Sequence, residues 1–305
     1  MPRVSILLTC FNHMQYLPAA MKSIQEQTFS DYEIIALDDG STDGSREWLE
    51  GCGYESRLVF HERNVGTYAS LNIGISTAKG GYIAILNDDD LWAPTKLEKQ
   101  VSFLDKNPKS GLVHTGGGFV DSSGSALKST PLGFEFNGIQ SGNALLSLIY
   151  FNKIIASGVL IRRECFDRLG GFTENLYGSG DWEMWLRIAE QFEMGFVKEP
   201  LTFYRWHESN ASRNLEKVWA DDVAIRTWLS ARFESYRLSG IPTSDLMDVE
   251  AHNWACLGTA KTLLGDRSGG RKAYAESIKL APRRFKTYAR WISTFFPSGV
   301  LRRMS

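Results

Sequence analysis

The chain has 305 residues, enough for one large domain and an appendage. Its hydrophobic content of 43% and charged content of 23% indicate an ordinary globular protein, and its net charge of −1 excludes a general attraction to nucleic acid. The four cysteines form no CxxC pair, which excludes a zinc knuckle and a disulfide framework. We therefore expect reduced thiols in a cytoplasmic protein. The longest apolar region, residues 144–161, is interrupted by Asn152 and Lys153 and is not expected to cross a membrane.

Strands and helices alternate through the first hundred residues. Apolar runs predict strands, and apolar residues at helical spacing predict the helices between them. This alternation favours right-handed βαβ crossovers, so the predicted fold class is α/β with a mostly parallel sheet flanked by helices. We expect strands over residues 4–9, 33–37, 58–60 and 82–86, and helices over residues 17–27, 69–78 and 94–106.

The pattern is less regular after residue 110. A strand over residues 112–114 is expected to lead into a flexible loop at Gly116–Gly118. Further expected elements are a strand over residues 157–161, a short helix over residues 166–172 and a helix that begins at Asp181. Beyond about Leu215 the sequence predicts a mainly helical region, with one hairpin of helices joined at Gly265-Asp266.

Acidic residues follow two of the predicted strands. The strand over residues 82–86 runs into Asp88, Asp89 and Asp90, whose like charges repel unless a cation holds them. Carboxylate oxygens favour Mg²⁺ or Mn²⁺. Such an ion usually fills its remaining coordination positions with phosphate and water oxygens. Ligands of open α/β sheets bind at the carboxyl ends of strands, so Asp39 and Asp89 are expected to share one crevice. The sequence therefore predicts a site for a divalent metal and a diphosphate.

Two common nucleotide-binding motifs are absent from the sequence. No GxGxxG follows the first strand and no GxxxxGK[ST] occurs, which disfavours a Rossmann dinucleotide site and a P-loop. Plain structural interpretations of the polar residues also remain open. Asp38-Asp39-Gly40-Ser41 suits a simple turn, Asp181 suits a helix cap, and His207 suits an ordinary histidine of the surface or core.

Several segments, taken together and in chain order, resemble the inverting glycosyltransferases of family 2. The resemblance implies a GT-A fold, transfer of a sugar from a nucleotide-diphosphate sugar, and a divalent metal, Mn²⁺ or Mg²⁺, as cofactor. The helical tail lies outside it. The segments that carry the resemblance are Val4–Thr9, Asp38-Asp39-Gly40-Ser41-Thr42-Asp43, Asn64-Val65-Gly66, Asn72-Ile73-Gly74, Asn87-Asp88-Asp89-Asp90 and Gly180-Asp181-Trp182.

The resemblance assigns nucleotide-binding roles to five positions. Asp39 is similar to the carboxylate that accepts the imide N–H of the base, with Asp38 assisting. Thr9 would line the nucleotide pocket, and Asn64 belongs to the second nucleotide-binding segment. Asp88 matches the position near the donor ribose.

Further positions are matched to the metal and the diphosphate. Asp89 matches the direct metal ligand, and His207 matches a histidine that in some relatives approaches the metal or diphosphate. Arg205 is a candidate to pair with phosphate. The family's usual Asp-x-Asp begins here with Asn87, an amide, which leaves open whether it or a neighbour such as Asp90 touches ribose or metal.

Asp181 matches the catalytic base of the family. Inversion requires the acceptor hydroxyl to attack the anomeric carbon from the face opposite the diphosphate, while a carboxylate takes the hydroxyl proton. A position at a helix start favours the ionised carboxylate, and a divalent ion neutralises the leaving group. The expected donor is a UDP-sugar, and the expected acceptor is a hydroxyl of a glycan, a lipid-linked molecule or a protein.

The expected organisation is a nucleotide-sugar-binding half over residues 1–110, an acceptor-binding and catalytic half over 111–214, and a helical region over 215–305. Arg271 to Arg303 is basic and bears aromatic residues, which suits either peripheral contact with an anionic membrane or the solvated face of a helical bundle. Two alternatives to a glycosyltransferase remain. The first is a sugar-nucleotide nucleotidyltransferase, which requires a glycine-rich basic loop after the first strand; no such loop follows Thr9. The second is a non-catalytic sugar-nucleotide or glycan-binding module, and the presence of Asp181 argues against it.

Overall fold

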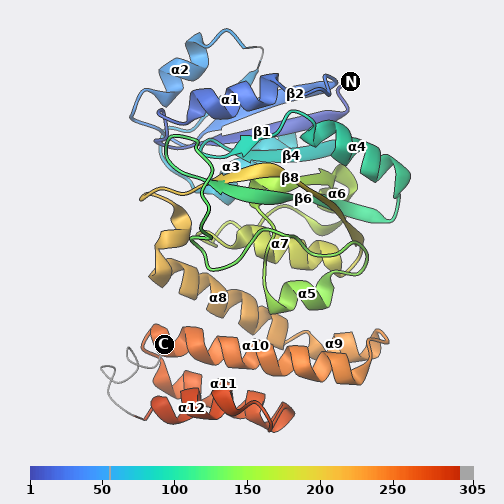
Figure 1. The fold of residues 1–305 in the computed structure, drawn as a ribbon, viewed down its shortest axis with the longest axis vertical. Helices are drawn as coiled ribbons and strands as arrows, with labels where there is room; N and C mark the ends of the chain where they lie inside the picture. Colours follow the sequence, from blue (N-terminus) through green and yellow to red (C-terminus); the bar gives the residue numbers. More distant parts are fainter. Residues whose placement is uncertain (55, 296–305) are drawn as a thin grey trace. The chain divides into compact units, whose positions relative to one another are not determined.

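The computed structural model describes residues 1–54 and 56–295 of the chain (Figure 1). These residues form two compact units. The N-terminal unit contains Met1–Leu148, Asn152–Leu176 and Gly180–Asn210, and the C-terminal unit contains Ile149–Phe151, Tyr177–Ser179 and the chain from Ala211 onward.

The N-terminal unit is built on a mixed sheet with the strand order β3-β2-β1-β4-β7-β6-β8-β5. Strands β3, β2, β1 and β4 pair in parallel, as do β6 and β8, whereas β7 is antiparallel to β4 and β6, and β5 is antiparallel to β8. This topology confirms the predicted α/β fold with a mostly parallel sheet. The strands are β1 Val4–Cys10, β2 Tyr32–Asp38, β3 Arg57–Phe60, β4 Tyr82–Asn87, β5 Leu91–Trp92, β6 Ser110–Val120, β7 Val159–Arg162 and β8 Glu193–Arg205.

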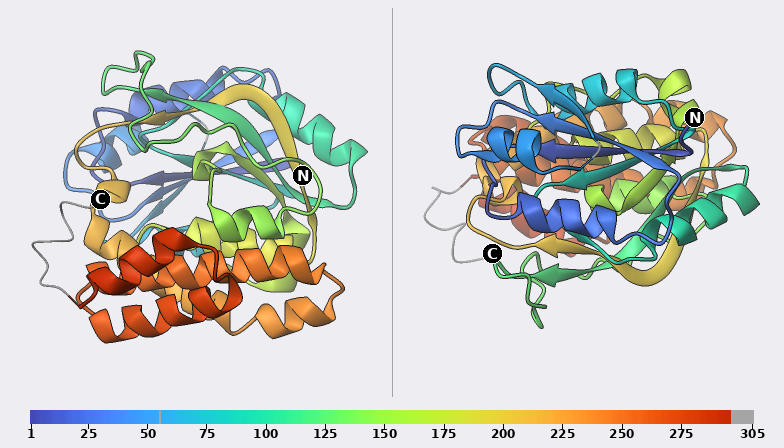
Figure 2. Two further views of the ribbon diagram at one scale, coloured as in Figure 1. Left: turned by 60° about the horizontal axis from the view of Figure 1, so that its bottom comes forward. Right: turned by 90° about the horizontal axis from the view of Figure 1, so that it is seen from above.

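Helices flank the sheet on both sides (Figure 2). Ile6 and Leu8 of β1 belong to the same buried apolar cluster as Met21 of α1 and Leu97 of α4, so these helices cover one face. Leu7 points to the other face, where α3 approaches so closely that a Cβ on Gly74 would lie 3.1 Å from a Leu7 methyl carbon. The helices of this part of the chain are α1 Leu17–Gln25, α2 Ser45–Gly51, α3 Thr67–Thr77, α4 Lys96–Lys106, α5 Leu145–Tyr150, α6 Arg163–Leu169 and α7 Gly180–Ala189.

The prediction of a flexible loop at Gly116–Gly118 is wrong. These glycines lie inside β6 and pair in parallel with β8 from Pro200 to Phe203. A Cβ on Gly117 would lie 2.3 Å from Ile155 Cδ1 and 2.8 Å from Thr202 O. The glycines therefore allow close packing within the sheet and do not supply mobility.

The C-terminal unit is helical, as predicted. In the α10–α11 hairpin, a Cβ on Gly258 would lie 2.7 Å from the ring of Tyr274, so the two helices pack closely. Within residues 1–54 and 56–295, no helix is long and apolar enough to span a bilayer. The predicted basic residues Arg302 and Arg303 lie outside the described residues. The helices of this unit are α8 Leu215–Ser230, α9 Phe233–Leu238, α10 Thr243–Leu263, α11 Arg267–Leu280 and α12 Phe285–Ser293.

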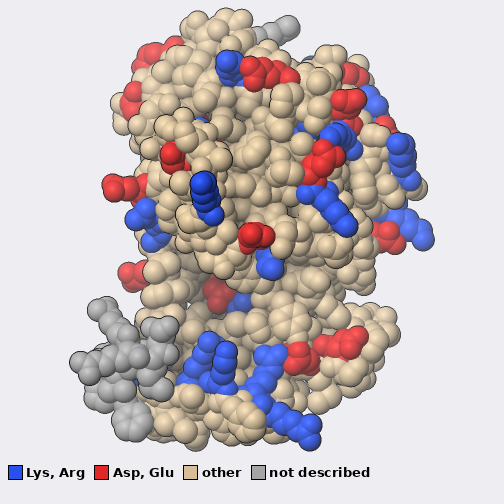
Figure 3. Space-filling view, viewed as in Figure 1, with Lys and Arg blue, Asp and Glu red and all other residues tan. Residues whose placement is uncertain are grey.

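Charged side chains are distributed unevenly on the face shown in Figure 3. Acidic and basic residues are interspersed over the N-terminal unit, whereas Lys and Arg gather over α10–α12. Exposed basic residues of α11, α12 and their connection are Lys272, Lys279, Arg283, Lys286 and Arg290. The basic character predicted for the tail is therefore present at the surface of the C-terminal unit.

Candidate active site

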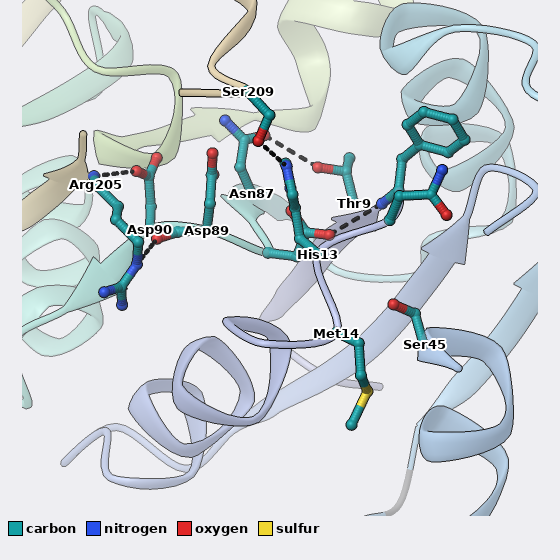
Figure 4. A network of polar contacts seen from close by, with 12 residues as sticks. Thr9, His13, Met14, Ser45, Asn87, Asp89, Asp90, Arg205 and Ser209 are labelled. Carbon is teal, nitrogen blue, oxygen red and sulfur yellow. Dashed lines mark hydrogen bonds and ion pairs between the residues drawn. The ribbon is translucent and has the colours of Figure 1, made fainter. Parts of the chain in front are cut away.

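The carboxyl ends of β1, β2 and β4 meet at one edge of the sheet. Thr9 is in register with Asn87 on one side and Leu37 on the other, and its Oγ1 donates to Asn87 Oδ1 over 3.0 Å (Figure 4). The amide of Asp39 donates to Cys10 O, and the amide of Asp88 donates to Thr9 O. The parallel register thus brings both predicted acidic segments to the same edge, beside Thr9.

Asp39 holds the loop that contains Asn64. Its Oδ1 accepts the Val65 N–H over 2.8 Å, and its Oδ2 accepts the Gly66 N–H over 2.9 Å. Gly40 makes this approach possible, because its φ is +78° and an added Cβ would lie 2.7 Å from the backbone carbonyl carbon of Arg63. Asn64 itself is exposed at this rim.

Asp38 is fully buried at the end of β2. Its Oδ2 accepts the Ser41 N–H over 3.3 Å, whereas no hydrogen bond partner for Oδ1 is present among the residues that the structure describes. A buried carboxylate oxygen without a donor is costly, so this oxygen is suited to a donor group supplied by a ligand.

Asp88 is held by the loop that follows β1. Its Oδ2 accepts the Phe11 N–H over 2.9 Å, and its Oδ1 lies 2.9 Å from Nδ1 of His13. Burial raises the pKa of Asp88, and the charge of Asp89 adds to this, although the hydrogen bond from His13 opposes it. Both oxygens of Asp88 are therefore engaged within the protein.

Asp89 is paired with His207, which follows β8. Asp89 Oδ2 lies 3.0 Å from Nε2 of His207, and Nδ1 of that ring lies 2.9 Å from Ser209 Oγ. The side chain of Asp89 keeps 13% of its surface exposed, twice the share of Asp88 at 6%. One carboxylate oxygen and one imidazole nitrogen thus converge at the accessible side of the β4 end.

Asp90 and Arg205 join the end of β4 to β8 and to the 3-10 turn Ala156–Gly158, which precedes β7. Asp90 is fully buried, accepts from Ser157 Oγ over 2.5 Å and accepts the backbone N–H of Arg205 over 3.0 Å. Burial and the neighbouring charge of Asp89 raise the pKa of Asp90 well above its usual value. The Arg205 guanidinium is also buried and donates to the carbonyl oxygen of Asp89, a contact drawn in Figure 4. It donates as well to the carbonyl oxygens of Asp121 and Ser122. These contacts hold both side chains within the protein, and a contact of Asp90 or Arg205 with the ligand stays a prediction.

Asp181 is positioned from a different element, the first turn of α7. Its Oδ1 accepts the Trp182 N–H over 2.7 Å, and its Oδ2 accepts from Asn152 Nδ2 over 3.3 Å. The amide of Asn152 is oriented because its Oδ1 accepts the Ile154 N–H over 3.0 Å. These contacts hold the Asp181 carboxylate in one orientation at the start of α7.

The amino-acid sequence assigns this site to a known family. The sequence profile of "Glycosyl transferase family 2" matches residues 5–170, more than half of the chain. The chain belongs to this family.

One relative and two solved structures are similar to this chain over most of its length. An uncharacterized glycosyltransferase of Rickettsia felis is 29% identical over 216 residues, which are 70% of this chain. The match spans only 36% of that relative, so this chain covers about a third of its length.

The two structures share the fold. S. aureus TarS 1-349 in complex with UDP-GlcNAc has a TM-score of 0.69 and 15% identity, covering 97% of this chain and 89% of that one. The mannosyltransferase PcManGT from Pyrobaculum calidifontis, in complex with GDP-Man and Mn²⁺, has a TM-score of 0.60 and 20% identity, covering 96% of this chain and 86% of that one.

The carboxylate of Asp89 and the imidazole of His207 are groups that fit a divalent metal. Carboxylate oxygen suits Mg²⁺ and Mn²⁺, and an imidazole nitrogen is a further ligand for Mn²⁺. No group of three or more His, Cys, Asp or Glu side chains with metal-binding geometry occurs in the part of the chain that the structure describes. A metal held here would therefore take most of its ligands from the donor diphosphate and water.

Three residues of the site were not predicted from the sequence: His13, Ser209 and Asn152. His13 and Ser209 lie in loops without periodicity, and they are 196 positions apart in the sequence. His13 could have been found from its position in the sequence. It lies in the loop after the first strand, and loops at the carboxyl ends of parallel strands border the ligand-binding site. Asn152 carried no signal, since its partner Asp181 lies 29 positions away.

Proposed function

We propose that this protein is an inverting, metal-dependent glycosyltransferase that moves a sugar from a nucleotide-diphosphate sugar to a hydroxyl of a glycan, a lipid-linked molecule or a protein. The observation that carries the proposal is the convergence of Asp89 and His207 at the end of β4, beside Asp39 and Thr9. A UDP-sugar is the proposed donor, supported by the UDP-GlcNAc complex of the similar TarS fold. The GDP-Man complex of PcManGT makes GDP-sugars the first comparison.

Donor binding is assigned to the edge formed by β1, β2 and β4. Each Asp39 oxygen accepts one backbone N–H and retains a lone pair, so the carboxylate can also accept the imide N–H of uracil. The Oδ1 of Asp38 offers a second acceptor, and Thr9 lines the same edge. These positions make up the nucleotide-binding half that we place within residues 1–110.

Asp89 and His207 would hold Mn²⁺ or Mg²⁺ together with the donor diphosphate. When bound, the ion supplies positive charge that stabilises the leaving diphosphate. The buried neighbours Asp90 and Asp88 fix the backbone on both sides of Asp89, so its carboxylate is held toward the site.

Asp181 is the proposed general base. The acceptor oxygen forms a bond to the anomeric carbon while the bond from that carbon to the diphosphate oxygen breaks, with inversion. The proton of the acceptor hydroxyl passes to the Asp181 carboxylate, and Asn152 keeps that carboxylate in place. The acceptor surface would then lie within residues 111–214.

The C-terminal helices are proposed to give peripheral contact with an anionic membrane surface from the cytoplasmic side. Phe285 and Phe295 are 78% and 58% exposed, and the basic residues Arg283, Lys286 and Arg290 of the same segment are also exposed. Flotation with vesicles that contain phosphatidylserine, at low salt, would detect this contact; protein left at the bottom of the gradient would remove it.

A thermal-shift screen combined with a transfer assay tests the proposed function. UDP, GDP and dTDP, and their sugars, are added to chelator-treated protein with and without Mn²⁺, because ligands of the native state raise its stability. We expect one nucleotide to stabilise the protein more in the presence of Mn²⁺, and the matching sugar to release that nucleotide slowly. A protein indifferent to all of them would refute the proposal, and metal-dependent binding without turnover would indicate a non-catalytic module.

A further inference from the structure

Asn72 of α3 binds the loop that precedes α7. Its Oδ1 accepts the Phe172 N–H over 2.7 Å, and its Nδ2 donates to Phe172 O over 3.0 Å. The same Nδ2 donates to Glu174 Oε1 over 2.9 Å. Gly171 permits this approach, because a Cβ there would lie 2.3 Å from Asn72 Oδ1. Both ends of the Asn72 amide are therefore engaged by one short loop, residues 171–174.

Helix α7 binds the same loop. Glu183, which lies in the first turn of α7 with Asp181, accepts from Thr173 Oγ1 over 3.1 Å. Arg187 donates from Nε to Glu183 Oε1 over 2.7 Å and from Nη2 to Gly171 O over 2.7 Å. The side chains of Glu183 and Arg187 are only 9% and 15% exposed, so water competes little with these contacts. The loop is thus fixed to the turn of α7 that carries the proposed base.

Helix α3 begins at the proposed nucleotide site. The Asp39 carboxylate accepts the backbone N–H groups of Val65 and Gly66, directly before the first residue of α3. Further along, the helix packs against the sheet so tightly that a Cβ on Gly74 would lie 2.8 Å from a methyl carbon of Leu37 in β2. A helix packed this closely behaves as a rigid element, so α3 places the loop before α7 relative to the donor site.

Resting on the function proposed above, we propose that Asn72 is a positioning residue for the general base Asp181. Asn72 holds the loop of residues 171–174, and the contacts of Glu183 and Arg187 fix the first turn of α7 to that loop. The base must lie within hydrogen-bond reach of the attacking oxygen, and a displacement of about 1 Å costs up to about a hundredfold in rate. Asn72 is assigned no contact with the nucleotide, so its loss slows the transfer step and leaves donor affinity unchanged.

Hydrolysis of the donor measures this effect, since water then takes the place of the acceptor. The water oxygen bonds to the anomeric carbon, the bond from that carbon to the diphosphate oxygen breaks, and a water proton passes to Asp181. Release of UDP from UDP-GlcNAc and of GDP from GDP-Man would be followed with Mn²⁺, and titration calorimetry would give the affinities for UDP and GDP. For the donor that wild type hydrolyses, we expect Asn72→Ala to lower kcat about tenfold and to change KM and nucleotide affinity by less than about twofold.

An exposed partner of the same amide provides a milder pair of variants. Glu174→Gln keeps an oxygen that accepts from Asn72 Nδ2, whereas Glu174→Ala removes it. We expect E174A to lower kcat about threefold and E174Q to match wild type. Should N72A not fold, this pair decides alone, and equal kcat in E174A and E174Q would then overturn the inference.

Ser5→Ala is the matched control for a loss of stability alone. Ser5 lies near the start of β1, whereas Thr9 lies near its end, and Ser5 Oγ donates to Glu33 Oε1 and accepts the Gly80 N–H. S5A should lower the melting temperature and leave kcat at the wild-type value. Equal kcat losses in N72A and S5A, wild-type kcat in N72A, or a parallel loss of nucleotide affinity in N72A would each overturn the inference. Wild-type protein that hydrolyses neither sugar would instead refute the proposed function, and this inference with it.

Discussion

The imidazole rings of His13 and His207 meet edge to face, with centroids 5.1 Å apart and planes at 79°. One ring comes from the loop after β1 and the other from the segment after β8. The ring of Tyr16 lies 4.9 Å from that of His207 and 5.9 Å from that of His13. These ring contacts hold His207 beside Asp89. The geometry of the candidate metal site therefore depends on the loop after β1 as well as on the segment after β8.

His207→Gln should weaken metal binding. The substitution removes one of the two proposed protein ligands and leaves Asp89 in place, so the affinity for Mn²⁺ in the presence of the preferred nucleoside diphosphate should fall about tenfold. Electron paramagnetic resonance of free Mn²⁺ measures this directly. His61→Gln is the matched control, since His61 lies at the end of β3 and contacts neither Asp89 nor His207 in the described structure. Equal Mn²⁺ affinity in H207Q and wild type would place the metal elsewhere.

Asp181→Asn should abolish sugar transfer without weakening the binding of the donor. The amide cannot accept the acceptor proton, so kcat should fall by about a thousandfold, while calorimetry should find the donor affinity unchanged. Asn152→Ala, which removes the hydrogen bond that orients Asp181 Oδ2, should lower kcat by about tenfold with the same donor affinity. Undiminished turnover of D181N would show that another group is the base.

Gly180→Ala should disturb the same site through packing. A Cβ on Gly180 would lie 2.7 Å from the ring of Tyr68, which is buried and stacked on Phe172 with centroids 5.6 Å apart. Because that ring has no room to move, we expect a loss of about 1–3 kcal/mol in the free energy of unfolding, together with lower kcat. Gly178→Ala serves as the control, since the nearest atom to its Cβ would be 3.9 Å away. A G180A variant as stable and active as G178A would contradict this account.

The sequence predicted the half of the sheet that follows simple periodicity. Strands β1, β2 and β4 are buried runs, and Leu97, Val101 and Leu104 of α4 fall at helical spacing on the core face. Strand β8 was missed because Pro200 and charged residues interrupt its apolar pattern. Its pairing with β6 also contains register shifts, so no period of two is visible.

The candidate site was predictable where it depends on strand ends. Asp39 and Asp89 follow β2 and β4 directly, and parallel pairing alone brings them to one edge. The partners that hold these carboxylates could not be predicted, because they are loop residues from distant parts of the chain. The pairing of Asp89 with His207, for example, joins positions 118 residues apart and depends on the position of β8.

His114 should make the protein less stable in mild acid. Burial lowers its pKa from 6.5 to about 4, and its Nε2 contacts the backbone of Ile139 at the carbonyl oxygen over 3.0 Å. Between these two pH values the unfolded chain binds a proton at this position and the folded chain does not. Stability is therefore complete above pH 6.5 and falls as the pH drops toward 4, by about 3 kcal/mol for this group.

The comparison with His114→Gln isolates this effect. Glutamine reaches the carbonyl oxygen of Ile139 without titrating, so urea unfolding should show a smaller loss of stability for H114Q than for wild type between pH 6.5 and 4. The difference should be about 3 kcal/mol. His252, whose pKa burial also lowers to about 4, titrates in both proteins and cancels from the comparison. Parallel pH profiles for the two proteins would mean that His114 is charged in the folded state.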